Sequence, residues 1–80
     1  MQRTVKLFAL ARDLAGTDAL QVELPPQPRV ADLRRALAEQ VPSLAPLVKS
    51  LLVAVGNDYA DDRAPLGDAE LACFPPVSGG

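Results

Sequence analysis

Eighty residues make a single domain, which is long enough to bury a core without needing disulfides or metals. The chain has no histidine and one cysteine, which excludes an internal disulfide, a Cys/His metal site and a nucleophile activated by imidazole. A formal net charge of −2, from 8 basic and 10 acidic residues spread along the chain, argues against nucleic acid as a partner. Without a signal peptide or an apolar stretch of membrane-spanning length, the sequence predicts a cytoplasmic protein with no membrane partner.

Two segments near the start alternate between apolar and polar residues, at residues 3–9 and 19–24. This period of two is typical of strands with one face buried. Residues 10–16 between them predict one short helical turn with a glycine stop at Gly16. Because the connection is short, we expect the two strands to pair as an antiparallel hairpin.

One amphipathic helix is predicted after the proline-rich residues 25–28, and Pro42 ends it. Its apolar stripe at helical spacing consists of Val30, Leu33, Leu37 and Val41. The residues expected on its solvated side are Arg34, Arg35, Glu39 and Gln40. Residues 43–50 predict a second short helical turn.

The second half of the chain predicts two more strands. Residues 51–57 are apolar and rich in branched side chains, which is typical of a central strand. Residues 57–68 have turn composition around Tyr59, and residues 70–76 predict a last strand stopped by prolines. The order indicates an α+β domain with a small mixed sheet. One helix can cover only one face of such a sheet, so the other face must meet water or a partner.

Alternation places two of the three aromatic side chains on that open face. Phe8 lies on the side of the first strand that also carries Lys6, and Phe74 lies opposite to Cys73 in the last strand. An exposed aromatic patch is typical of a docking surface. The alternative is that loops fold over these rings or that they lie singly on the surface. Cys73 is expected to be a small core residue.

The chain is predicted to divide into a folded domain at residues 1–76 and a flexible tail at residues 77–80. The tail consists of Val77, Ser78, Gly79 and Gly80, and it follows Pro75 and Pro76, which impose an extended exit. Glycines are costly to order, so two of them after a strand predict either a ragged end or the working part of the molecule.

No side chain of this protein is well suited to catalysis. The carboxylate pairs, Asp61 with Asp62 and Asp68 with Glu70, lie in turn-rich segments where solvated loop charge is expected. A reaction would therefore use the backbone or the terminus. The carboxyl carbon of Gly80 is unhindered, and activation as an acyl-adenylate would let a sulfur nucleophile displace AMP and leave a thiocarboxylate.

Three segments together resemble one known family: ARDLAGT at 11–17, LLVAVGNDY at 51–59 and FPPVSGG at 74–80. They are similar to the small subunits of molybdopterin synthase, which belong to the ubiquitin-like β-grasp sulfur carriers, and the likeness covers essentially the whole chain. Two features depart from the family. The acidic turn at 67–70 has a shifted glycine, and Arg29 stands where a Ser or Thr helix cap is usual, which would weaken that helix end.

The resemblance implies a β-grasp fold and a subunit that is not catalytic alone. Gly80 would be adenylated by an E1-like enzyme that uses ATP and then converted to a thiocarboxylate, with no cofactor or metal bound to the carrier itself. The terminus would insert into the large subunit of molybdopterin synthase, in a heterotetramer. There it would donate sulfur to precursor Z (cyclic pyranopterin monophosphate) to build the dithiolene of molybdopterin.

The resemblance also assigns residues. Gly79 and Gly80 match the family's functional residues. The implied partner-binding residues are Phe8, Tyr59, Phe74, Pro75 and Pro76, and of these Tyr59 matches less tightly.

Three other functions are compatible with the residues. The chain could be the sulfur carrier of thiamin thiazole synthesis, a ubiquitin-like modifier conjugated to lysines through Gly80, or an interaction module with an inert tail. The Phe-Pro-Pro-Val run before the glycines favours the molybdopterin branch.

Overall fold

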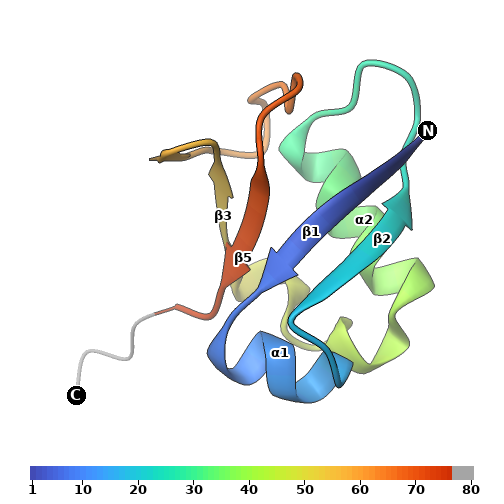
Figure 1. Cartoon of the computed structure of the whole chain (residues 1–80), viewed down its shortest axis with the longest axis vertical. Helices are drawn as coiled ribbons and strands as arrows, with labels where there is room; N and C mark the ends of the chain where they lie inside the picture. The colour runs from blue at the N-terminus through green and yellow to red at the C-terminus, as the bar shows by residue number, and fades with distance from the viewer. Residues whose placement is uncertain (77–80) are drawn as a thin grey trace.

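The computed structural model describes residues 1–76, and the predicted tail, Val77–Gly80, lies outside the described residues. The elements follow one another as shown in Figure 1. In chain order they are β1 (Gln2–Leu7), α1 (Ala9–Ala15), β2 (Ala19–Glu23), α2 (Val30–Gln40), the 3-10 turns η1 (Pro42–Leu44) and η2 (Val48–Ser50), β3 (Leu52–Val55), β4 (Asp58–Tyr59) and β5 (Leu71–Phe74).

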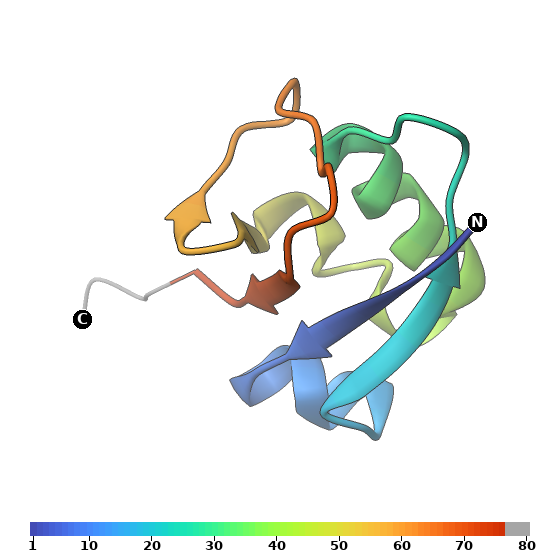
Figure 2. The same cartoon turned by 45° about the horizontal axis from the view of Figure 1, so that its top comes forward.

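The strands form one mixed sheet in the order β2-β1-β5-β3-β4. The neighbours β1 and β5 are parallel, and all other neighbouring strands are antiparallel. Figure 2 shows the sheet in front, with α2 and the 3-10 turns behind it. This arrangement confirms the predicted α+β fold of the β-grasp type, with one main helix on one face. In the described part of the chain, residues 1–76, no helix is both long and apolar enough to cross a membrane.

The core lies between the sheet and α2, and it is built from side chains that alternate inward along the strands. Strands β1 and β5 contribute two buried residues each, and α2 contributes the predicted stripe except for its last member, the half-buried Val41. The largest fully buried side chains of this core are Val5, Leu7, Val22, Val30, Leu33, Leu37, Leu44, Leu51, Val53, Leu66, Leu71 and Cys73.

Two boundaries near the start differ from the prediction. Strand β1 ends at Leu7, so Phe8 does not belong to it but precedes α1 with an extended backbone. The connection to β2 is a helix of seven residues rather than one turn, and it ends at Gly16 with φ 76°. That left-handed conformation costs glycine little, so the predicted glycine stop is confirmed. The antiparallel pairing of the first two strands is also confirmed.

The second half contains one strand that the prediction missed. Residues assigned to a turn include β4, which pairs with the end of β3 across Gly56 and Asn57. Strand β5 is shorter than residues 70–76 because it ends at Phe74, and it occupies the middle of the sheet, while β3 lies between β5 and β4.

The expectation of a weakened start of α2 at Arg29 is not met. The Asp32 carboxylate accepts a hydrogen bond of 2.8 Å from the backbone N–H of Arg29. The next two N–H groups, of Val30 and Ala31, donate to the backbone carbonyls of Ala64 and Asp62 at 3.0 Å each. The loop before β5 therefore satisfies donors that a Ser or Thr side chain would otherwise satisfy.

Arg34 is also not the solvated residue that its sequence neighbourhood suggests. Its side chain is only 19% exposed, and its Nε lies 2.7 Å from the Asp62 carboxylate. One guanidinium nitrogen donates to the carbonyl of Val48 at 2.6 Å. Arg34 therefore ties α2 to both η2 and the loop before β5, because its planar fork can serve two acceptors at once.

Candidate functional site

Three aromatic rings meet on the face of the sheet that α2 does not cover. The rings of Phe8 and Phe74 are stacked, with centroids 4.6 Å apart and planes 6° apart. Tyr59 approaches Phe74 edge-on, with centroids 6.1 Å apart. Phe8 is 40% exposed and Tyr59 is 67% exposed, so water reaches the group. We call these rings, together with Leu52, the aromatic patch.

The sheet register explains why residues far apart in sequence meet here. Phe74 on β5 lies opposite Leu52 on β3. Ala54 on β3 lies opposite both Tyr59 on β4 and Ala72 on β5. Two small alanines side by side leave the space into which large neighbouring rings can extend.

Phe8 joins the patch because the chain stays in register with β5 just beyond β1. The last parallel pair is Leu7 with Cys73, and the N–H of Phe8 then donates to the carbonyl of Cys73 at 3.2 Å. This bond places Phe8 beside Phe74. The predicted outward direction of both rings is confirmed, and the alternative of single, separate rings is wrong.

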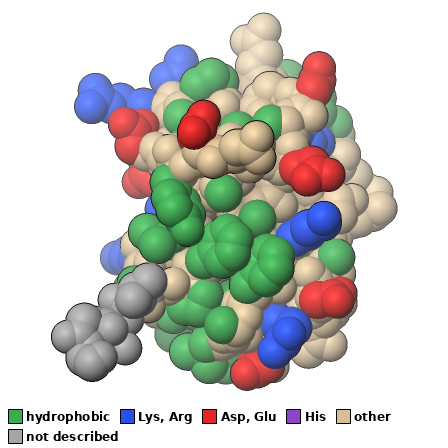
Figure 3. Space-filling model, turned by 60° about the vertical axis from the view of Figure 1, so that its left-hand side comes forward, with side chains coloured by type: hydrophobic (Ala, Val, Ile, Leu, Met, Phe, Trp, Pro, Cys, Tyr) green, Lys and Arg blue, Asp and Glu red, His purple; other side chains and the backbone are tan. Residues whose placement is uncertain are grey.

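Figure 3 shows the hydrophobic side chains gathered on this face in a continuous area, with charged side chains around it. Leu52, which is 37% exposed, is the member that sequence reasoning missed. The signal was present, because Leu51 and Leu52 are adjacent in the strand predicted at residues 51–57, and only one of two adjacent strand residues can point inward. Leu51 is the buried one.

The chain leaves the sheet next to the aromatic patch. Pro75, which is half-buried, and the exposed Pro76 directly follow Phe74 at the end of β5. The other predicted site residues, Val77, Ser78, Gly79 and Gly80, lie outside the described residues. Among the described site residues, the structure brings together Phe8, Tyr59 and Phe74, with the two prolines following Phe74.

The one thiol of the protein is unsuited to nucleophilic chemistry. Cys73 is fully buried, as predicted, and burial raises its pKa from the ordinary value of 9.0 to about 11, an effect that the charge of Arg34 partly opposes. A thiol with this pKa is protonated at neutral pH, and the thiolate is the reactive form. Cys73 therefore belongs to the core.

The carboxylates of Asp61 and Asp62 are engaged with other groups rather than with each other. The Asp62 side chain pairs with Arg34, and the Asp61 side chain accepts from the backbone N–H of Arg63 at 2.9 Å. No group of three or more potential metal ligands occurs in this part of the chain. The distinctive feature of the described site is its exposed apolar surface.

A family model and individual relatives both match this chain over nearly its whole length. Residues 5–80 match the model of the ThiS family. The chain is 40% identical over 79 residues to the molybdopterin synthase sulfur carrier subunit of Escherichia coli, covering 95% of this chain and 96% of that protein. It is 37% identical to the subunit of the same name from Caenorhabditis briggsae, covering 95% and 94% of the two chains.

The fold is similar to that of SAMP1 from Haloferax volcanii, with a TM-score of 0.81, 28% identity and full coverage of both chains. The family match covers nearly the whole chain, and the sequence relatives match over almost their full length. The chain therefore belongs to the ThiS family of small β-grasp proteins.

Proposed function

We propose that this protein is the sulfur-carrier subunit of a molybdopterin synthase, in which the aromatic patch docks on a partner subunit and Gly80 carries the sulfur. The observation that supports this most directly is the exposed, stacked pair of Phe8 and Phe74, which lies beside the point where the chain leaves the sheet. A partner that covers the patch would receive the residues beyond Pro76 next to its own surface.

The patch has the properties of a binding anchor. Its rings are prearranged by the sheet, so little side-chain freedom is lost on association. Aromatic side chains bury a large apolar area each and are enriched among the residues that dominate binding energy. An apolar surface that remains partly exposed in the free protein can contribute this energy when a partner removes it from water.

The chemistry follows from the carboxyl group of Gly80, to which the family match extends. An oxygen of the carboxylate attacks the α-phosphate of ATP, pyrophosphate leaves, and an acyl-adenylate forms. A sulfide-level donor then attacks the carbonyl carbon and AMP leaves, so the product is a thiocarboxylate. The sulfur of this group would be donated to precursor Z for the dithiolene of molybdopterin.

This proposal needs two partners. The large subunit of molybdopterin synthase would provide the active site, in a heterotetramer, and an E1-like enzyme would carry out adenylation. Relatives named as a subunit of molybdopterin synthase support a complex with a partner subunit. We expect the protein to act in the cytoplasm, where its free thiol would stay reduced.

The decisive experiment is an intact-mass measurement. The protein is incubated with ATP, an activating enzyme and a sulfide source, and it should gain the mass of one sulfur-for-oxygen exchange at Gly80. The same incubation without ATP should leave the mass unchanged. Sulfur found on Cys73 instead of Gly80 would overturn the proposal.

A second candidate function is conjugation to other proteins. The similarity to SAMP1 favours it, because SAMP1 is named a small archaeal modifier protein. A modifier would form isopeptide-linked adducts with lysines through Gly80. Immunoblots of cells that express a tagged chain should show a ladder of covalent adducts for a modifier and a single band for a sulfur carrier.

A further inference from the structure

Strand β2 forms one edge of the sheet and has only one hydrogen-bonded strand neighbour, β1. Its backbone groups alternate between facing β1 and facing outward. On the inner side, the N–H of Leu24 donates to the carbonyl of Met1, and the carbonyl of Asp18 accepts from the N–H of Leu7, both at 2.8 Å. The outward-facing residues of β2 are therefore the odd-numbered ones, Ala19, Gln21 and Glu23.

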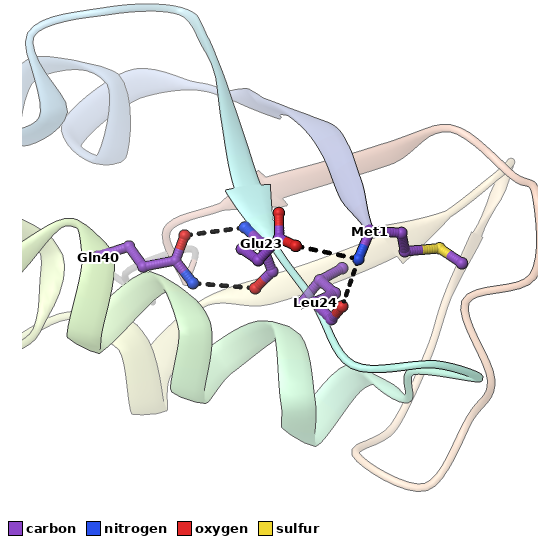
Figure 4. A network of polar contacts seen from close by, with 4 residues as sticks. All are labelled: Met1, Glu23, Leu24 and Gln40. Carbon is purple, nitrogen blue, oxygen red and sulfur yellow. Dashed lines mark hydrogen bonds and ion pairs between the residues drawn. The ribbon is translucent and has the colours of Figure 1, made fainter.

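A glutamine side chain occupies the outward groups of Glu23. The amide oxygen of Gln40 accepts from the N–H of Glu23 at 2.8 Å, and the amide nitrogen of Gln40 donates to the carbonyl of Glu23 at 2.9 Å. Figure 4 shows the two parallel bonds, which reach from the end of α2 to the edge of the sheet. A residue of an added strand would make the same pair of bonds.

The other end of β2 is occupied in a similar way. The hydroxyl of Thr17 donates to the carbonyl of Ala19 at 2.9 Å and accepts from the N–H of Ala19 at 3.4 Å. Between the two occupied positions stands Gln21, whose outward N–H and carbonyl have no partner among residues 1–76. One open residue is too short a stretch to hold another strand.

We propose that Gln40, assisted by Thr17, guards the edge strand β2 against strand addition by a second copy of this chain. Unpaired sheet edges invite pairing with other strands, and proteins commonly block them. A side-chain amide is a suitable block because it satisfies both backbone groups of one residue and offers no continuation to a further strand.

The register of β2 defines the dimer that Gln40 would prevent. Without Gln40, two consecutive outward residues, Gln21 and Glu23, are open. In an antiparallel pair around a two-fold axis at Val22, Gln21 of each copy would lie opposite Glu23 of the other. Both pairs would be hydrogen-bonded ones, so four backbone bonds would join the two sheets into one.

The opposite edge of the sheet is limited by a different means. Strand β4 has only two residues, Asp58 and Tyr59. A very short edge strand is itself a recognised protection against pairing. The five-residue β2 is the longer of the two edges, and it is the one at which side chains occupy the backbone groups.

The test is the oligomeric state of a Gln40→Ala variant, measured by light scattering across the micromolar to millimolar range. The parent protein should remain a monomer, and the variant should shift toward the mass of a dimer as its concentration rises. Glu39→Ala is the matched control, since it removes a neighbouring exposed side chain of α2 that makes no hydrogen bond to β2 in the described part of the chain, and it should remain monomeric.

A second substitution locates the interface. Proline at an outward-facing position of an edge strand removes a donor that the sheet itself does not use. Adding Gln21→Pro to the Gln40→Ala variant should therefore restore the monomer. A Gln40→Ala variant that stays monomeric, or a dimer that survives the Gln21→Pro change, would overturn the proposal.

Hydrogen exchange on the unmodified protein tests the guard without any substitution. The amide of Gln21 should exchange at least about tenfold faster than the amide of Glu23, because only the latter is bonded to Gln40. Equal protection of the two amides would mean that the edge is covered in another way, and the proposal would be wrong.

Discussion

The two sides of β5 face different surroundings. Leu71 and Cys73 point into the core and are fully buried, whereas Ala72 and Phe74 point to the open face and are only half-buried. Successive side chains of a strand point to opposite faces, so a strand of four residues contributes to both surfaces. Stability and partner binding can therefore be altered separately at adjacent positions.

The two sides of β5 should affect stability and binding separately because their apolar area leaves water at different steps. An inward side chain leaves water when the chain folds, which contributes about 1.5–3 kcal/mol for a residue of the size of leucine. The outward rings remain partly in water, so the corresponding energy would be available to a partner that covers them. The predictions below test this division.

The largest effect is expected at Gly80, the residue proposed to carry the sulfur, and it should involve neither the buried nor the open side of β5. Deletion of Gly80 should abolish sulfur loading, because the acyl group would then be on a different residue. The melting temperature should not change. Mass spectrometry after loading and a thermal melt check the two parts, and a clear fall in melting temperature would show that the terminus contributes to the fold.

On the inward side, Leu71→Ala should lower the free energy of unfolding by about 2–5 kcal/mol, since it leaves a cavity in the core. Denaturant titration measures the loss. The folded fraction of the variant should still bind its partner with the affinity of the parent protein. A weaker binding constant after correction for the folded fraction would mean that the two sides of the strand are coupled.

Cys73, also on the inward side, should make the free energy of unfolding depend on pH in the alkaline range. With its pKa raised to about 11, the folded protein keeps the thiol proton between pH 9 and pH 11, while the unfolded chain, with a pKa of 9.0, loses it. The unfolded state binds fewer protons there, so stability should fall with rising pH by a total of roughly 3 kcal/mol. Well below pH 9, where both states keep the proton, the thiol contributes no slope.

The matched control is Cys73→Ala, whose stability should lack this part of the alkaline decline. The difference between the two pH curves isolates the thiol from other groups that titrate in the same range. Identical slopes for parent and variant would contradict the buried, protonated thiol.

On the outward side, Phe74→Ala should weaken binding to the partner subunit by about 2 kcal/mol, as truncation of an aromatic anchor does. Calorimetric titration measures this. Leu10→Ala is the control, because Leu10 is an exposed apolar residue on α1 outside the aromatic patch, and its affinity should match that of the parent. Unchanged affinity of Phe74→Ala with a large loss of stability would place the ring in the core.

The local sequence pattern was sufficient to predict much of the candidate site. The outward direction of Phe74 and the burial of Cys73 follow from a period of two, which the backbone imposes on any strand. Phe8 lies one residue beyond β1, but its extended backbone continues the same alternation. The stacking of the two rings does not follow from it. It depends on the parallel pairing of β1 with β5, which are separated by most of the chain.

Arg34 and Gln40 show most clearly which contacts local sequence pattern cannot predict. Helical periodicity assigns both to the solvated side of α2, and it cannot say which groups of other segments that side will meet. Arg34 bonds to Asp62 and to the carbonyl of Val48, and Gln40 bonds to the edge of β2. These contacts required the fold to bring the segments together.

The sequence by itself determined the fold class, the apolar stripe of α2, the glycine stop at Gly16 and the outward aromatic residues. Each of these depends on interactions within a few neighbouring residues or on a simple period. The tertiary structure alone decided the order of the strands, the existence of β4 and the partners of the charged and amide side chains. These features depend on pairing between segments distant in sequence, and local composition does not encode which distant groups will come within bonding distance.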